Sequence, residues 1–469
     1  TVISLLVTSE KCIVKEDGEE IEAQIEPTLY NERLRGEGVL LSFRVTLPPL
    51  SSRIYSIHHS SSPSKTFISK LSAPSNLIDT IQKQIPSFFI VTPENNSVVT
   101  LSTPNLSSIH DTKSGLLKKI SSKTIGDIPI ELGLSEYTKS GGGAYILRVN
   151  GVPKILSGDH MISLFVSGPI QSTSYSISNL YQHSITIRDL PGDLSDHIHV
   201  SIRVDLRKEK NTELVWTLSS ENEDDDVSFY TDSVGLQMLK RKSYSSLSKS
   251  ANYYPMPTGA IVEDGKKRIT VLSDVEHGVM SIGKMGMEVM LDRMLNQDDG
   301  KGLGQSDDSY PTDLLPIDIH LTIVPERRDT PSESLHHTYH SLSSSIALQS
   351  LLYPPVTMTS SKGSISRTPH RSFPCDIQLL TTRMISINKM MVIIFRNGID
   401  CSMKTTVTCI DSKITDSIQS LLSRLGATLN IHRTLLNGIE VIQTYNTVQD
   451  IDHSAIPSPQ KFTSFVFDI

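Results

Sequence analysis

The sequence predicts an all-β protein built from several antiparallel β-sandwich domains, with few short helices. Apolar and polar residues alternate, with many β-branched residues, in segments 39–45, 185–188, 199–205, 214–218 and 269–272. This period of two is typical of half-buried strands. Asn-Gly, Pro-Gly and Asp-Gly turn signals recur along the chain. Closely spaced strands and turns favour antiparallel sheets over βαβ units.

Two segments predict short helices. Ile414, Ile418, Leu421, Leu422 and Leu425 repeat at helical spacing, and Gly426 can end that helix. Residues 76–85 form a second candidate, which Pro86 would terminate.

Two Ser-rich tracts, 60–66 and 360–366, are typical of linkers or surface loops. They divide the chain into three units and two connections. We predict a small β-sandwich over 1–60, a linker over 61–85, a large central β-sandwich over 86–345, a linker or loop over 346–372 and a terminal β domain over 373–469.

Composition limits the function classes. The chain has 469 residues and a formal net charge of -7, which argues against nucleic acid or anionic membrane as a main partner. It contains no run of about 18 apolar residues, so no transmembrane span is predicted. The first residues, TVISLLV, are typical of a strand rather than of a signal peptide. A start without Met is expected of a fragment or a processed chain.

The four cysteines are too few for a disulfide scaffold. Cys401 and Cys409 flank a short loop, which a disulfide between them can close. Two free thiols are an equally good interpretation. Cys12 and Cys375 can pair only if the fold brings them together.

Asn95 and Asn105 begin acceptor sequons, NNS and NLS, in turn-like sequence. Both are candidates for N-glycosylation in a secretory compartment.

No catalytic constellation is evident. His336, His337 and His340 lack the glutamate of a zinc-protease motif and are interpreted as a surface patch. His197 and His199 share a face of a predicted strand, interpreted as solvated. The acidic run 221–226 lacks a calcium-loop glycine pattern. We therefore predict no catalytic residue and no metal ligand in this chain.

The segment 298–304, DDGKGLG, follows an apolar strand. A tight glycine turn is the simpler interpretation. The alternative is a loop that projects toward a ligand, with Lys301 or Asp299 bonded to hydroxyl groups.

Several segments resemble, in order, the part of Golgi-type α-mannosidases of glycoside hydrolase family 38 that follows the catalytic domain. The most similar are ANYYPMP at 251–257 and EVMLDRML with DDGKGLGQ within 288–305. Shorter matches lie at 47–57, 109–120, 141–147, 229–244 and 373–380. They cover nearly the whole chain.

The resemblance implies a large central supersandwich of the galactose mutarotase-like type. It also implies an N-terminal catalytic domain, absent from this chain, that holds zinc and a carboxylate nucleophile and cleaves α-mannosidic bonds with retention. No cofactor is implied for this chain itself. The substrate would be a mannose-containing N-glycan, and the location the lumen of the secretory pathway, in the Golgi or alternatively the lysosome.

Two residues of this chain match positions at which the family completes its sugar pocket. Tyr145 lies in GGGAYIL, and Lys301 lies in DDGKGLG, where the family usually has arginine. A lysine offers one point charge where arginine forks onto two oxygens.

The sequence thus predicts the C-terminal β region of an α-mannosidase, supplying scaffold and part of the sugar pocket. The alternative is a stand-alone, non-catalytic carbohydrate-binding or structural β-sandwich protein.

Overall fold

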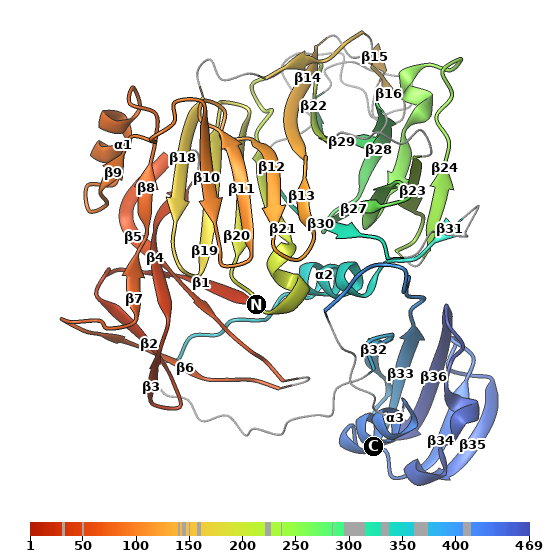
Figure 1. Cartoon of the computed structure of the whole chain (residues 1–469). Helices are drawn as coiled ribbons and strands as arrows, with labels where there is room; N and C mark the ends of the chain where they lie inside the picture. The colour runs from red at the N-terminus through yellow and green to blue at the C-terminus, as the bar shows by residue number, and fades with distance from the viewer. Residues whose placement is uncertain are drawn as a thin grey trace.

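Segments in which apolar and polar residues alternate form antiparallel strands in the computed structural model (Figure 1). The structure describes residues 1–30, 33–48, 51–138, 141–142, 147–149, 151–156, 161–220, 227–235, 237–283, 285–294, 315–329, 337–360, 374–406 and 414–469. The predicted all-β class is confirmed. The five predicted strands lie in β5 (Arg33–Arg44), β20 (Tyr181–Arg188), β21 (Ile198–Val204), β22 (Thr212–Ser220) and β27 (Lys267–Ser273).

A twelve-stranded sheet forms one layer of the central body. From one edge to the other, its strands are β31 (His337–Thr338), β24 (Met238–Arg241), β23 (Ser228–Asp232), β26 (Gly259–Glu263), β27, β30 (Ile317–Arg327), β21, β20, β19 (Gln171–Ile177), β18 (Ile162–Ser167), β8 (Lys70–Ser72) and β9 (Ile90–Val91). All described pairs in it are antiparallel except β8 with β9.

Two smaller sheets cover one face of this layer. The four-stranded sheet contains β10 (Val98–Ser102), β11 (Leu106–Asp111), β12 (Leu117–Ser122) and β13 (Gly126–Ile128). The six-stranded sheet has the order β17 (Lys154–Ile155), β14 (Glu131–Thr138), β22, β29 (Met285–Met294), β28 (His277–Ile282) and β25 (Tyr254–Met256). β15 (Gly141–Gly142) pairs separately with β16 (Leu147–Arg148).

The three sheets share one hydrophobic core. Trp216 of β22 is fully buried in it, with Ile120 of the four-stranded sheet and Val271 of the twelve-stranded sheet. Apolar burial on this scale is the main favourable term in folding. The fold therefore contains a large central β-sandwich.

Two sheets form the N-terminal body. One contains β1 (Val2–Val7), β5, β4 (Ala23–Tyr30) and β7 (Thr66–Ile68); the other contains β2 (Cys12–Glu16), β3 (Glu19–Ile21) and β6 (Tyr55–His59). The prediction of a linker over 61–85 is wrong. This segment contains β7, β8 and helix α1 (Ile78–Gln84), because Leu71, Ile81 and Ile85 bury their side chains in the N-terminal core. The short helix expected near 76–85 is confirmed.

Helix α2 (Leu342–Leu352) occupies the beginning of the segment that we predicted to be a linker over 346–372. The Ser341 hydroxyl accepts a hydrogen bond from the amide of Ser344 and caps this helix. Ala347 packs against Leu272 and Val324 on the twelve-stranded sheet. Burial against the sheet outweighs the weak helix propensity of its serine run.

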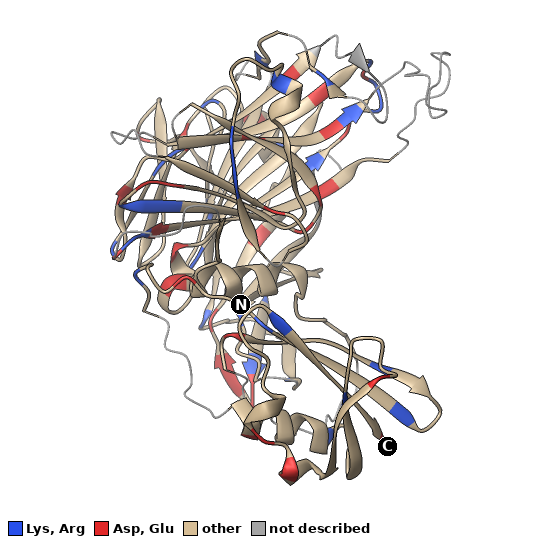
Figure 2. Cartoon of the chain, turned by 90° about the vertical axis from the view of Figure 1, so that its right-hand side faces the viewer, with Lys and Arg blue, Asp and Glu red and all other residues tan. Residues whose placement is uncertain are grey.

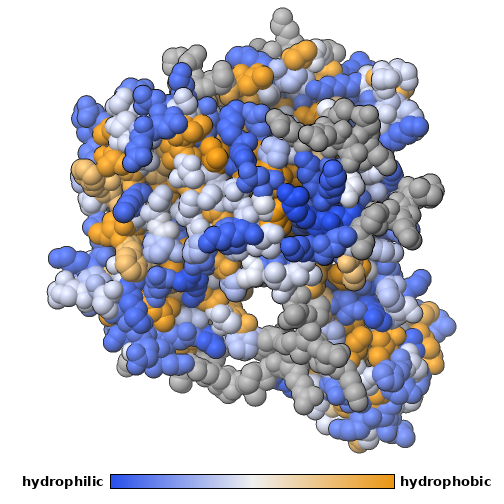
Figure 3. Space-filling view, viewed as in Figure 1, coloured by the Kyte–Doolittle hydropathy of each residue, from blue (hydrophilic) through white to orange (hydrophobic). Residues whose placement is uncertain are grey.

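The terminal domain consists of a five-stranded antiparallel sheet and one helix that packs in the same core (Figure 1). The strands are β32 (Ile377–Ser386), β33 (Lys389–Arg396), β36 (Lys461–Asp468), β34 (Leu429–Thr434) and β35 (Val441–Thr447). The predicted helix is confirmed as α3 (Ile414–Arg424), and Gly426 follows it at φ +93°. Hydrophobic residues gather at the surface of this domain in Figure 3, consistent with exposed Leu436, Ile439 and Ile442.

A buried arginine joins the terminal domain to the central sandwich. Arg268 of β27 has no exposed side-chain surface and lies 2.6 Å from Glu263 Oε2 and 2.7 Å from Asp400 Oδ2. Burial lowers the pKa of Arg268, but the attraction of Glu263, Asp400 and Glu326 outweighs it and the net pKa is raised. The arginine remains charged and fixes the chain at residue 400 against the large sheet.

The possible disulfide between Cys401 and Cys409 does not form, because the Cys401 thiol is free and exposed. Cys12 is also free and is buried, whereas Cys375 is disulfide-bonded. Cys409 lies outside the described residues.

Basic and acidic residues are interspersed along the described ribbon in Figure 2. Within the described ranges, no helix has both the length and the apolar character needed to cross a membrane.

We expect Arg268→Met to lower the free energy of unfolding by about 3–5 kcal/mol, because it removes a buried cation from buried Glu263 and partly buried Asp400. Denaturant unfolding of the purified chain measures this change. Lys118→Met is the control, since it breaks the exposed Lys118–Glu131 pair and should leave stability nearly unchanged. Equal stability of the two variants would contradict the assigned role of Arg268.

Candidate functional site

Strand β22 pairs with β14 on one side and with β29 on the other, both antiparallel. β14 and β29 therefore run in the same direction. Their last residues, Thr138 and Met294, are both paired with Thr212. Neighbouring strands are about 4.8 Å apart, so these two strand ends lie about 10 Å from each other at one edge of the sheet.

The segments that carry the two predicted pocket residues begin at this edge. Tyr145 comes seven residues after the end of β14, and Lys301 comes seven residues after the end of β29. Both residues lie outside the described residues, as do the loop 298–304 and the acidic run 221–226. The described parts of both strands end at one edge of the sheet.

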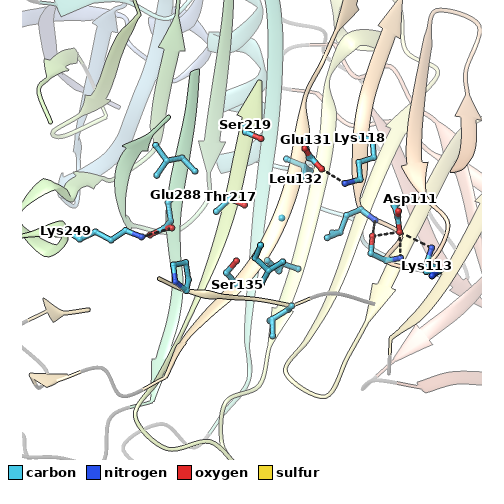
Figure 4. A pocket seen from close by; sticks show the side chains of 18 residues that line it. Asp111, Lys113, Lys118, Glu131, Leu132, Ser135, Thr217, Ser219, Lys249 and Glu288 are labelled. Carbon is cyan, nitrogen blue, oxygen red and sulfur yellow. Dashed lines mark hydrogen bonds and ion pairs between the residues drawn. The ribbon is translucent and has the colours of Figure 1, made fainter. Parts of the chain in front are cut away.

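A buried carboxylate lies farther along the same sheet, in register with Thr217. Glu288 of β29 is 2% exposed and accepts hydrogen bonds from the hydroxyls of Tyr137, at 2.8 Å, and Tyr253. Lys249 of the 3-10 helix η2 (Lys249–Asn252) places its ammonium 3.1 Å from the same carboxylate (Figure 4). Burial, and then the charge of Glu288, raise the pKa of Tyr253. The phenol therefore remains a proton donor to this carboxylate.

A second ion pair occupies the row next to this edge of the sheet. Glu213 of β22 is fully buried, and its Oε1 lies 3.0 Å from the guanidinium of Arg293 in β29. Tyr137, Glu213 and Arg293 stand side by side on β14, β22 and β29. The Glu213–Arg293 pair ties β29 to β22, and the bond from Tyr137 to Glu288 ties β14 to β29.

The outer face of the six-stranded sheet is hollowed by a cavity of about 800 Å³. Glu131, Ser135, Thr217, Ser219 and Glu288 line it from the strands (Figure 4). Sequence analysis missed these residues and Lys249. Their signal was available in part, because β14 reads ELGLSEYT and alternates leucine on the core face with small or polar residues outside.

His197 and His199 do not lie on a solvated strand face, so the interpretation of these two histidines is wrong. His197 is 3% exposed and bonds to the Ser343 hydroxyl at 2.8 Å, because helix α2 covers this part of the sheet. The Nε2 atoms of His199 and His340 are also buried. Burial lowers the pKa of His197 and of His340 to about 4. His336 lies outside the described residues.

The structure distinguishes the two sequons. Asn95 is exposed, and its Oδ1 accepts a hydrogen bond from the Ser97 amide at 2.8 Å. The Nδ2 atom of Asn105 instead donates to Ser195 Oγ and Asp196 Oδ1, both at 2.8 Å. A glycan on Asn105 would have to replace these partly buried bonds.

We tested the described residues for a zinc site. Nowhere in the described ranges do three or more His, Cys, Asp or Glu side chains gather closely enough to hold a metal ion. The described residues therefore do not fit zinc.

Comparison with known proteins supports the resemblance to family 38 α-mannosidases. Residues 101–301 match the C-terminal domain of glycosyl hydrolases family 38. Human α-mannosidase 2 is 28% identical over 418 residues, which cover 82% of this chain and 35% of that protein. Mouse α-mannosidase 2 is 24% identical over 99% of this chain and 42% of its own length. The chain therefore spans less than half the length of these relatives.

A solved structure agrees with the fold. The crystal structure of an α-mannosidase from Enterococcus faecalis V583 superposes with a TM-score of 0.57 at 11% sequence identity, covering 100% of this chain and 54% of that one. Ordered sequence similarity and a shared fold lead to one conclusion. Over most of its length the chain is similar to the C-terminal region of glycosyl hydrolase family 38 α-mannosidases.

Proposed function

We propose that this chain forms one wall of the mannose-binding pocket of a Golgi-type α-mannosidase that processes N-glycans. Its partner would be an N-terminal catalytic domain of the same protein, which would hold zinc and the reactive groups. The observation that carries the proposal is the pairing of Thr138 and Met294 with the same residue, Thr212. It starts the segments of Tyr145 and Lys301 from one edge of one sheet.

Tyr145 and Lys301 would bind and orient the sugar. A tyrosine offers an aromatic face and a hydroxyl, and an ammonium offers three donors to sugar oxygens. Positioning of this kind lowers the barrier of a reaction whose chemical groups lie elsewhere. The buried Glu288 and Glu213 clusters would keep the strand ends rigid beneath both segments.

The stand-alone carbohydrate-binding or structural protein has less support. The relatives that match most of this chain are α-mannosidases, and nothing in the described part favours a separate role. A location in the lumen of the secretory pathway, in the Golgi, agrees with the location implied by the resemblance.

In a protein that includes the catalytic domain, Lys301→Ala should lower kcat/KM for an aryl α-mannoside roughly tenfold to hundredfold, the effect of losing a charged hydrogen bond. Tyr145→Phe should lower it about two- to tenfold, because a neutral bond is lost. Lys301→Arg should retain or improve kcat/KM, since arginine offers two parallel donors.

Lys83→Ala and Tyr353→Phe are matched controls at exposed positions in α1 and after α2. Both should keep wild-type kinetics, and thermal unfolding should show that all variants are folded. Wild-type kinetics in both Tyr145→Phe and Lys301→Ala would refute the proposed pocket.

The purified chain 1–469 should neither hydrolyse an aryl α-mannoside nor bind stoichiometric zinc, because the reactive groups would belong to its partner domain. Activity assays and metal analysis of the same preparation check both points. Robust turnover by this chain would overturn the proposed division of labour.

If the chain passes through the secretory pathway, Asn95 should carry an N-glycan and Asn105 should not. Expression in a secreting eukaryotic host, followed by mass spectrometry with and without glycan removal, measures this. Asn95→Gln should abolish the mass shift, and Asn105→Gln should leave it unchanged. A glycan on Asn105, or none on Asn95 in the secreted product, would count against this assignment.

A further inference from the structure

The hollow on the outer face of the six-stranded sheet exists because the residues facing it from β14 and β22 are small. They are Gly133, Ser135, Thr217 and Ser219. A Cβ atom on Gly133 would lie 2.6 Å from Thr217 Oγ1, closer than side-chain atoms approach. The sequence thus keeps this part of the face open, and the resulting volume of about 800 Å³ is within the usual range of ligand sites.

Hydroxyl groups in this hollow lack partners. Ser135 is 5% exposed and lines the cavity, yet its hydroxyl makes no hydrogen bond within the described part of the chain. On the adjacent strand, the hydroxyls of half-buried Thr217 and exposed Ser219 also make no hydrogen bond with described residues (Figure 4). A buried hydroxyl is normally hydrogen-bonded, so that of Ser135 is suited to a polar ligand, and the two more accessible hydroxyls beside it extend the row. Each hydroxyl can both donate and accept.

Charged groups lie at both ends of the row and balance each other. Glu288 with Lys249 stands at one end, and Glu131 with Lys118 stands at the other. Asp111 and Lys113 add one charge of each sign at the rim. The described lining therefore carries three acidic and three basic residues, and it favours neither an anion nor a cation.

Apolar side chains form part of the rim. Ile155 of β17 is 72% exposed beside the cavity, and Pro153 and Ile282 also line it. Aliphatic side chains can cover the C–H faces of a pyranose ring. Seven of the eighteen lining residues are apolar and ten are charged or carry a hydroxyl group. The mixed lining does not suit a lipid or another extended apolar ligand.

We propose that this hollow binds a neutral oligosaccharide, of about two or three hexose units in view of the cavity size. Ser135, Thr217 and Ser219 exchange hydrogen bonds with ring hydroxyls, the Glu288–Lys249 and Glu131–Lys118 pairs bind hydroxyls at the two ends, and Ile155 covers a C–H face. The site goes beyond the proposed mannose pocket, because it requires neither Tyr145 nor Lys301.

Isothermal titration of the chain 1–469 with mannotriose, maltotriose and cellotriose tests the site, each probe being raised to millimolar concentration. We expect saturable binding of at least one. In the double variant Ser135→Ala/Thr217→Val, Kd should rise at least about tenfold, the change expected from two lost hydrogen bonds. Thr100→Val, a matched change at an exposed strand position outside the cavity, should bind as the wild type does.

Ile155→Ala is a second test at an exposed position where unfolding is not expected, and it should also weaken binding. Failure of the wild-type chain to bind any of the three sugars would overturn the proposal, as would unchanged Kd in both the double variant and Ile155→Ala. Tyr145→Phe and Lys301→Ala should leave this binding intact. Their kinetic effects therefore distinguish a failure of the mannose pocket from a failure of this site.

Discussion

The double pairing of β22 is the constraint on which the functional architecture depends. Because β14 and β29 both pair antiparallel with it, two segments far apart in sequence leave the sheet at one edge and in one direction. Backbone hydrogen bonds fix that register over whole strands, since a slip by one residue would turn the core leucines of β14 toward solvent. Trp216, at the centre of β22, anchors the same strand in the shared core.

Buried charged residues stabilise the arrangement of the strands in addition to the backbone hydrogen bonds. Glu288, held by two tyrosines and Lys249, and Glu213, held by Arg293, stabilise the edge of the six-stranded sheet. Arg268 does the same at the junction with the terminal domain. Such groups are costly to bury unless their partners are in place, so each cluster is tied to a single arrangement of the chain around it.

The outer face of the six-stranded sheet shows how one surface serves two roles. Near the strand ends its side chains are large, charged and mutually bonded, as in the row of Tyr137, Glu213 and Arg293. Toward the middle they are small and hydroxylic, as at Gly133, Ser135 and Thr217, and the surface is hollowed. The same strands thus carry large, bonded side chains near their ends and small side chains that leave space for a ligand toward their middle.

The sequence by itself determined the β class, the strands with a period of two and helix α3, because local periodicity records which face is buried. It also indicated the similarity to family 38 α-mannosidases, through motifs that occur in the same order. Only the tertiary structure decided that 61–85 and 342–352 are ordered, that His197 is buried under α2 and that Cys401 is free. It also revealed Glu288, Lys249 and the hydroxyl row. These features depend on contacts between residues distant in sequence, such as Ser135 beside Val215, and no local pattern encodes such contacts.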